Sequence, residues 1–272
     1  MIQVSFQGER GAYSEAAAKS FFSDNEITPI PCTTFAEVLE KTTTDKTDYA
    51  VLPVENSLEG SVGESYDLLY TTPLNATGEI YHRIEHCLIG IGKLDEIETV
   101  YSHPQALGQC RKFIELHGMR TIPTYDTAGS VKIVKELNKK NCACIASKAA
   151  STIYGMPIVS EKIANNQNNY TRFLILSKKN SAETGNDKTS IIFSIKHEPG
   201  SLYRIIENFH KKNINMTKIE SRPTRENTWE YNFYVDFEGH EKNPKILEIL
   251  DKIKKETIFL KILGSYPCAK LS

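Results

Sequence analysis

The sequence predicts an α/β protein in which a two-lobed domain precedes a smaller ferredoxin-like domain. Before residue 178, short apolar strands alternate with helical segments, a pattern typical of a mostly parallel sheet, here in two lobes. After residue 188 the order is strand, helix, strand, strand, helix, strand, which is ferredoxin-like. The stretch between them has Ala182 as its only apolar residue, so it indicates a linker. We therefore expect domains over 1–178 and 189–272, joined by a linker over 179–188.

The chain begins with an apolar strand over Ile2–Phe6, a glycine turn from Gly8 to Ser14 and a helix over Glu15–Phe22. Glycines let backbone N–H groups approach a ligand, and the start of a helix favours negative charge, so the turn suits an anion. The spacing is not Gly-x-Gly-x-x-Gly, which argues against a dinucleotide.

Two capping boxes, over Thr34–Glu37 and Ser61–Glu64, mark helix starts. Between them, a buried strand over Tyr49–Val54 is followed by a turn with three polar residues: Glu55, Asn56 and Ser57. Ligands of open α/β sheets bind beyond the carboxyl ends of strands. These side chains are therefore site candidates.

A strand over Thr99–Ser102 leads into a helix that has Pro104 in its first turn. Gln105 and Gln109 are four residues apart and share one face of that helix. Either both amides contact one ligand, or both glutamines are solvated on a surface helix. The spacing alone leaves both interpretations open.

The remaining elements of the first domain continue the alternation. We expect strands over 78–92, 120–125 and 142–146, and helices over 127–137 and 147–154. Gly155 and Pro157 then end the last helix in the usual order.

The loop from Asn165 to Phe173 is crowded with amides, which suit a loop that presents hydrogen-bond donors. Thr171 and Arg172 lie where this loop becomes a strand. Threonine offers one hydroxyl, and arginine offers a planar fork that matches a carboxylate. The alternative is a polar loop that caps a strand, with Arg172 in a surface ion pair.

The second domain has clear periodicity. One helix places Leu202, Ile205, Ile206 and Phe209 on an apolar face, and a second helix repeats that spacing from Ile246. From Trp229 to Phe237, apolar residues alternate with mostly polar ones, so we expect a strand with one buried face.

Composition excludes several classes of function. The net charge is −1 and no basic block occurs, so nucleic acid is not an expected partner. No stretch approaches the ~18 apolar residues of a membrane span, and the N-terminus has no signal-like segment, so we expect a cytoplasmic, soluble protein without membrane contact. The six cysteines are dispersed and fit reduced core thiols. His82 and His86 are four apart in a strand-like segment, too distant to share a metal ion.

Six short segments, in order, resemble one family. They are Gly8–Ser14, Val54–Ser57 with Gly60–Val62, Ser102–Gln105, Asn169–Phe173, Pro199–Tyr203 and Ile219–Pro223. Together they resemble prephenate dehydratase in its monofunctional form with a C-terminal ACT domain, and the resemblance covers nearly the whole chain.

The resemblance implies two lobes like a type II periplasmic-binding fold, with the substrate between them. It implies loss of carbon dioxide and water from prephenate to give phenylpyruvate, a step of L-phenylalanine biosynthesis, with no metal or organic cofactor. Thr171 would donate to the leaving hydroxyl and Arg172 would anchor a carboxylate. The residues implied to assist or orient the substrate are Glu55, Asn56, Ser57, Ser102, Gln105, Gln109, Asn169 and Phe173.

The ACT resemblance implies feedback inhibition by L-phenylalanine at a subunit interface, and hence a homodimer or homotetramer. The implied effector residues are Pro199, Gly200, Ser201, Leu202, Tyr203, Glu220, Ser221, Arg222 and Pro223. Two residues depart from the family pattern, since Ser201 replaces a usual alanine and Asn165 replaces a frequent aspartate. The alternatives are an arogenate dehydratase and a non-catalytic amino-acid sensor.

Overall fold

The structure is a computed structural model that describes residues 1–224 and 230–271. The chain forms two compact units. The first unit contains residues 1–65 and 80–173, and the second contains 66–79 and 174–272. Trp229, expected on a strand, lies outside the described residues.

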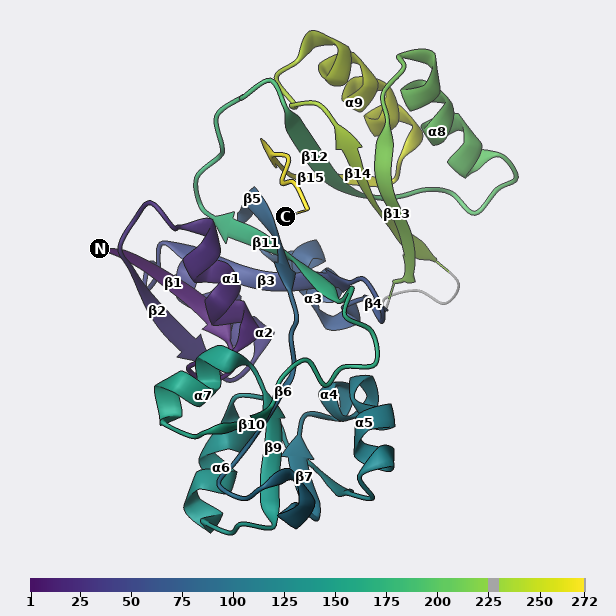
Figure 1. Cartoon of the computed structure of the whole chain (residues 1–272). Coiled ribbons are helices and arrows are strands. Elements are labelled where there is room, and N and C mark those ends of the chain that lie inside the picture. The colour runs from purple at the N-terminus through teal and green to yellow at the C-terminus, as the bar shows by residue number, and fades with distance from the viewer. Residues whose placement is uncertain (225–229, 272) are drawn as a thin grey trace. The chain divides into compact units, whose positions relative to one another are not determined.

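The first sheet of the first unit has the strand order β2-β1-β3-β11-β5, with β4 paired to β3. Strand β1 is parallel to both β2 and β3. The bounds are β1 Ile2–Gln7, α1 Tyr13–Phe21, β2 Ile27–Cys32, α2 Phe35–Thr43, β3 Tyr49–Asn56, β4 Gly60–Ser61, α3 Gly63–Thr71, β5 Asn75–Arg83 and β11 Tyr170–Ser177. Figure 1 shows this sheet with α1 and α2 beside it. Strands β5 and β11 continue from one unit into the other.

The start of α2 shows how local sequence sets an element. The Glu37 N–H donates to Thr34 Oγ1 at 3.1 Å, as a capping box requires. The Glu37 carboxylate accepts from the Thr33 N–H at 2.7 Å instead of from Thr34. The predicted start of the helix at Thr34 is confirmed, although the Glu37 carboxylate bonds to the backbone of Thr33 and not to that of Thr34.

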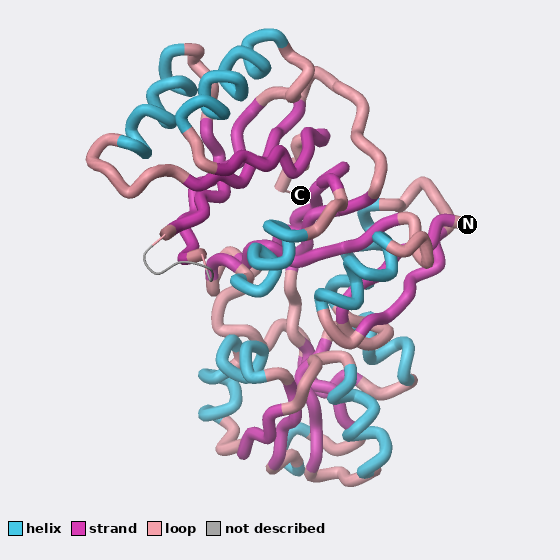
Figure 2. Tube along the Cα trace, turned by 180° about the vertical axis from the view of Figure 1, so that it is seen from behind, coloured by secondary structure: helices cyan, strands magenta, loops and turns pink. Residues whose placement is uncertain are grey.

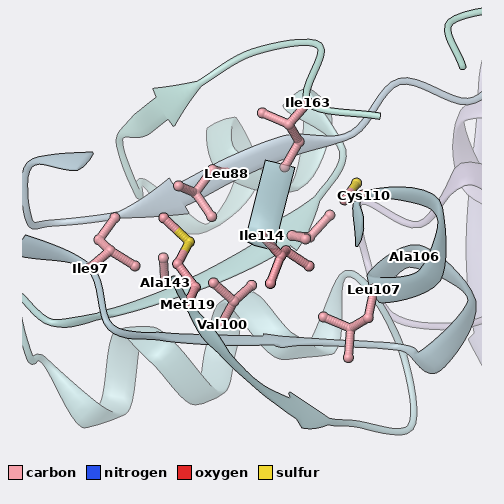
Figure 3. Packing of buried hydrophobic residues seen from close by; sticks show 11 residues of the cluster. Leu88, Ile97, Val100, Ala106, Leu107, Cys110, Ile114, Met119, Ala143 and Ile163 are labelled. Carbon is pink, nitrogen blue, oxygen red and sulfur yellow. The ribbon is translucent and has the colours of Figure 1, made fainter. Parts of the chain in front are cut away.

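The second sheet of the first unit has the order β10-β6-β9-β7-β8. Its pairs β7–β8 and β7–β9 are parallel, whereas β6–β9 and β6–β10 are antiparallel, so the sheet is mixed. The bounds are β6 Cys87–Gly90, a 3₁₀ turn at Leu94–Glu96, β7 Thr99–Ser102, α4 Pro104–Gln109, α5 Arg111–Leu116, β8 Arg120–Pro123, α6 Gly129–Leu137, β9 Cys142–Ala146, α7 Lys148–Tyr154 and β10 Ile158–Ser160. Figure 3 shows its apolar core, in which Val100, Ile114 and Met119 pack together.

One predicted strand is wrong. The expected strand over 78–92 is two strands, β5 and β6, in different sheets, and residues 84–86 connect them. His86 therefore lies in a link between the two lobes, not inside a strand, and it is only 2% exposed.

The second unit contains the predicted ferredoxin-like fold. Its strand order β13-β14-β12-β15 is antiparallel throughout. The bounds are β12 Asp187–Ser194, α8 Ser201–Lys211, β13 Met216–Pro223, β14 Tyr231–Glu238, α9 Pro244–Glu256 and β15 Phe259–Pro267. Figure 2 shows α8 and α9 on one face of this sheet. Ile205 and Phe209 of α8 are buried in this core, whereas Ile206 is 37% exposed.

The polar face of β14 is also buried. Asn232, Tyr234 and Asp236 are each less than 8% exposed. Residues 66–79 contribute to this burial, because the Tyr234 hydroxyl donates to the Tyr66 carbonyl at 2.9 Å. Within the described parts of the chain, no helix is long and apolar enough to cross a membrane.

Candidate active site

A cavity of about 440 Å³ opens in the first unit. Both lobes line it, the first through residues between 7 and 64 with Thr171 and Phe173, and the second through residues between 84 and 127. The N-terminal ends of α1 and α2 lie in its wall. Because a helix N-terminus presents backbone N–H groups and a positive dipole end, this wall suits an anion.

The charge of the lining is unusual for a cavity with a wall that suits an anion. Among the described residues that line it, Glu64 and Asp126 are the carboxylates, and none is lysine or arginine. Hydrogen-bond donors in the lining must therefore come from hydroxyls, amides, imidazoles and the backbone.

Thr171 is the second residue of β11, which begins at Tyr170, so the strand starts earlier than the sequence suggested, and the Thr171 side chain lines the cavity. It is 9% exposed. Asn56 Nδ2 donates to Thr171 Oγ1 at 3.0 Å. With this N–H directed at its oxygen, the Thr171 hydroxyl can direct its own hydrogen elsewhere.

The orientation of the Asn56 amide follows from its surroundings. Asn56 Oδ1 accepts from the backbone N–H groups of Leu58 at 3.0 Å and Glu59 at 3.1 Å. The oxygen must face these donors, so the NH₂ group faces the other way, toward Thr171 and Asn169. Asn56 Nδ2 donates to Asn169 Oδ1 at 2.7 Å.

The network continues to Gln109 and His86. Asn169 Nδ2 donates to Gln109 Oε1 at 2.9 Å, and His86 Nε2 lies 2.9 Å from the same oxygen. The Tyr13 hydroxyl lies 2.9 Å from His86 Nδ1 and 2.7 Å from the Glu85 carbonyl oxygen, and its single hydrogen can serve one of the two. Burial lowers the pKa of His86 below its ordinary value, although the bond to Gln109 opposes this shift.

Sequence reasoning missed His86 and Tyr13. Spacing assigned His86 only to the question of a metal, and Tyr13 only to a resembling segment. The available signal was a single imidazole just before the apolar run Cys87–Gly90, which becomes informative only when the chain is known to leave one sheet there.

The structure brings five expected site residues to the cavity: Asn56, Gln105, Gln109, Thr171 and Phe173. Asn169 does not line it, but it is fully buried and connects Asn56 with Gln109. The two glutamines of α4 both line the cavity, with Gln109 buried and Gln105 exposed.

Arg172 and Glu55 are not brought to the cavity lining. Adjacent residues of a strand point to opposite faces, so Arg172 faces away from the side of β11 that carries Thr171. Arg172 is 4% exposed, and its Nη1 lies 3.9 Å from Glu55 Oε2.

Ser57 and Ser102 also lie outside the lining. The Ser57 hydroxyl accepts from the Tyr170 N–H at 2.9 Å and donates to the Asn168 carbonyl at 3.2 Å, so it holds the amide-rich loop. Ser102 is fully buried, and its hydroxyl donates to the Ile145 carbonyl at 2.7 Å.

A charged contact joins the two lobes beside the cavity. Glu9 Oε2 lies 2.6 Å from Lys132 Nζ, and the Tyr125 hydroxyl donates to Glu9 Oε1 at 3.0 Å. The hydrogen bond from Lys132 holds the pKa of Glu9 below its ordinary value. The glycine turn of the first lobe is thus tied to the second lobe.

The expected effector residues lie in the second unit. Gly200 has φ of +82° at the turn before α8, a conformation that favours glycine. Tyr203 is 67% exposed. The other segment is the end of β13, an edge strand of the sheet, where Arg222 Nη2 lies 3.3 Å from Asp67 Oδ1.

Comparison with known proteins identifies the family. The family model of prephenate dehydratase matches residues 4–181, and that of the ACT domain matches residues 189–255. A prephenate dehydratase of Methanocaldococcus jannaschii is 40% identical over 264 residues, which cover 95% of each chain. Arogenate dehydratase 2 of Petunia hybrida is 37% identical over 98% of this chain and 72% of its own length.

Solved structures share the whole architecture. A prephenate dehydratase of Arthrobacter aurescens in complex with L-Phe has a TM-score of 0.90 at 28% identity and covers 98% of this chain and 90% of its own. GqqA, described as a quorum-quenching acylase, has a TM-score of 0.89 at 31% identity, with 98% of each chain covered. The fold and family expected from the six segments are confirmed: the chain belongs to the prephenate dehydratase family, in the form that carries a C-terminal ACT domain.

Proposed function

We propose that this chain converts prephenate to phenylpyruvate and that the Thr171 hydroxyl donates a hydrogen bond to the leaving hydroxyl. In this reaction the electron pair of the breaking C–C bond completes the aromatic ring as the C–O bond breaks. Carbon dioxide and hydroxide leave, and the hydroxide becomes water by taking a proton from solvent. The observation that carries the proposal is the bond from Asn56 to Thr171 Oγ1, because it leaves the hydroxyl hydrogen of Thr171 for the cavity.

The absence of lysine and arginine from the described lining supports the same chemistry. The departing carboxylate loses its charge in the transition state, so a cation paired with it would stabilise the substrate more than the transition state. Neutral donors and the starts of α1 and α2 bind the carboxylates with less of this penalty.

Arg172 takes a different role in this proposal from the anchor that the resemblance implied. Because it lies beside Glu55 and outside the lining, we assign it to positioning β11 and the neighbouring Thr171. Ser57 and Ser102 likewise support the loop and the second sheet, while Gln105, Gln109 and Phe173 are proposed to contact the substrate.

Thr171→Val and Thr171→Ser test the proposal, because valine keeps the shape and serine keeps the hydroxyl. Removal of one positioned hydrogen-bond donor to a developing negative charge lowers kcat by roughly 10²- to 10³-fold. We expect kcat for phenylpyruvate formation to fall on that scale in Thr171→Val and to survive largely in Thr171→Ser, with unchanged circular dichroism in both. A folded Thr171→Val protein with near-normal turnover would remove Thr171 from this role.

Arogenate is a second candidate substrate, and the cavity offers a reason. Arogenate carries an ammonium group where prephenate has a keto group, and Glu64 and Asp126 supply carboxylates to the lining. Turnover of the two substrates side by side identifies the preferred one. Glu64→Gln should lower kcat/KM for arogenate alone if Glu64 contacts that ammonium.

An acylase activity, as described for GqqA, is not favoured at Thr171. A serine or threonine nucleophile requires a base beside its hydroxyl. The neighbour of Thr171 Oγ1 is the NH₂ group of Asn56, which cannot remove a proton. A non-catalytic amino-acid sensor would convert neither prephenate nor arogenate.

Feedback inhibition by L-phenylalanine follows from the ACT domain and from the L-Phe complex of the Arthrobacter relative. We propose that the effector binds between subunits of a cytoplasmic dimer or dimer of dimers, with the edge strand β13 at the interface. Typical coupling of ~1–3 kcal/mol predicts a several-fold or larger loss of apparent substrate affinity. Sedimentation and initial rates with and without L-phenylalanine test both parts, and a monomer that L-phenylalanine does not inhibit would contradict them.

A further inference from the structure

We propose that His86 is a positioning residue: its neutral ring, with the hydrogen on Nε2, completes the run of hydrogen bonds and holds the Gln109 NH₂ group toward the cavity. The use of this donor by a substrate rests on the proposed function. The direction of the hydrogen bonds follows from the geometry of the network.

The direction begins at the backbone. Two N–H groups fix the Asn56 oxygen, so the Asn56 NH₂ group faces Asn169. The side-chain atom of Asn169 that receives this bond must be its oxygen, which leaves its NH₂ group toward Gln109. The Gln109 atom at that contact must in turn be its oxygen.

This oxygen requires a donor from His86. An unprotonated Nε2 at 2.9 Å from Gln109 Oε1 would place two acceptors against each other. The hydrogen therefore lies on Nε2, and in the neutral ring Nδ1 is an acceptor. The Tyr13 hydroxyl lies 2.9 Å from Nδ1 and 2.7 Å from the Glu85 carbonyl oxygen, and its single hydrogen must then point at Nδ1. The ring is 2% exposed, and such burial disfavours a second proton.

The consequence is a pair of donors at the cavity. Gln109 Oε1 is occupied by His86 and Asn169, so the Gln109 NH₂ group remains for a ligand. At the other end of the network, Thr171 Oγ1 accepts from Asn56, so the hydrogen of the Thr171 hydroxyl also remains for a ligand. If His86 Nε2 carried no hydrogen, it could not donate to Gln109 Oε1. The Gln109 amide would then tend to rotate, and its oxygen would face an anionic substrate in place of its NH₂ group.

The first test compares His86→Gln with His86→Leu. Glutamine carries an NH₂ group that reaches near the position of Nε2, whereas leucine fills space without a donor. We expect kcat/KM for prephenate to fall roughly 10- to 100-fold in His86→Leu, the scale of a misplaced site group, and to recover most of that loss in His86→Gln. Near-normal His86→Leu activity, or equal losses in two folded variants, would overturn the proposal.

The second test does not depend on activity. Of the seven histidines, His86 is assigned in ¹⁵N spectra of the full chain as the imidazole signal lost in His86→Gln. We expect a protonated, pyrrole-type Nε2 and an unprotonated, pyridine-type Nδ1 at neutral pH. The opposite tautomer or a cationic ring would overturn the proposal even if prephenate is turned over. The expected tautomer without turnover would instead count against the proposed reaction alone.

Discussion

Two buried polar clusters, one in each unit, differ in charge. In the cavity of the first unit, the buried network consists of neutral side chains, namely Asn56, Asn169, Gln109, Thr171 and His86. In the second unit, Lys188 Nζ lies 2.7 Å from Glu79 Oε1, and both side chains are buried. The neutral network orients hydrogen-bond donors without adding charge, whereas the Lys188–Glu79 contact is an ion pair.

We expect the neutral network to matter mainly for catalysis and the buried ion pair to matter mainly for stability. A neutral network can hold donors toward a ligand without adding a cation that would stabilise the departing carboxylate. A buried ion pair stabilises only while both partners remain, because loss of one leaves an uncompensated charge. Damage to the first network should therefore appear in kcat/KM, and damage to the second in the free energy of unfolding.

Lys188→Met should have the largest effect on stability. It leaves the Glu79 carboxylate buried without the ammonium group, and breaking such a pair costs about 3–5 kcal/mol. The control is Lys211→Met, which removes an exposed ion pair with Glu207 on α8 and should cost less than about 1 kcal/mol. Urea unfolding of Lys188→Met and Lys211→Met measures the two costs. The double variant Lys188→Met/Glu79→Met should recover much of the loss. Equal costs for the two lysines would show that burial of the Lys188–Glu79 pair adds nothing to its effect on stability.

Asn169→Asp should have the next largest effect, and on activity. Aspartate still accepts from Asn56, but it replaces the donor toward Gln109 by an acceptor. The Gln109 amide should then rotate, and we expect kcat/KM for prephenate to fall roughly 10²-fold, as for a misplaced site group. Asn168→Asp is the matched control, because it adds the same charge at an exposed neighbour. If both variants lose activity equally, charge and not direction is responsible.

Local patterns predicted what is locally determined. The cap at Thr34 and the ferredoxin-like order were confirmed because capping and periodicity depend on residues a few positions apart. The face of Arg172 was not predictable in this way. Successive residues of β11 alternate between its two faces, but only the pairing of the strand decides which of Thr171 and Arg172 meets the cavity.

Burial by distant segments was also beyond sequence reasoning. The polar residues of β14 are buried partly because residues 66–79 belong to the second unit, far earlier in the chain. His86 became a network residue because β5 and β6 belong to different sheets. In both places the decisive neighbour is remote in sequence, so no spacing rule identifies it.

Glu9→Gln should have the smallest effect and should depend on pH. The pKa of Glu9 is lowered from 4.5 in the folded protein, mainly by the hydrogen bond from Lys132, so its contribution to stability is present above 4.5 and is lost as the pH falls through the lowered value. The Glu9 side chain is 30% exposed, so we expect a contribution of at most about 1 kcal/mol. The difference in unfolding free energy between wild type and Glu9→Gln should therefore shrink between pH 7 and pH 3. A difference that stays constant would show that the contact acts through shape and not through charge, which would bring it closer to the neutral network beside it.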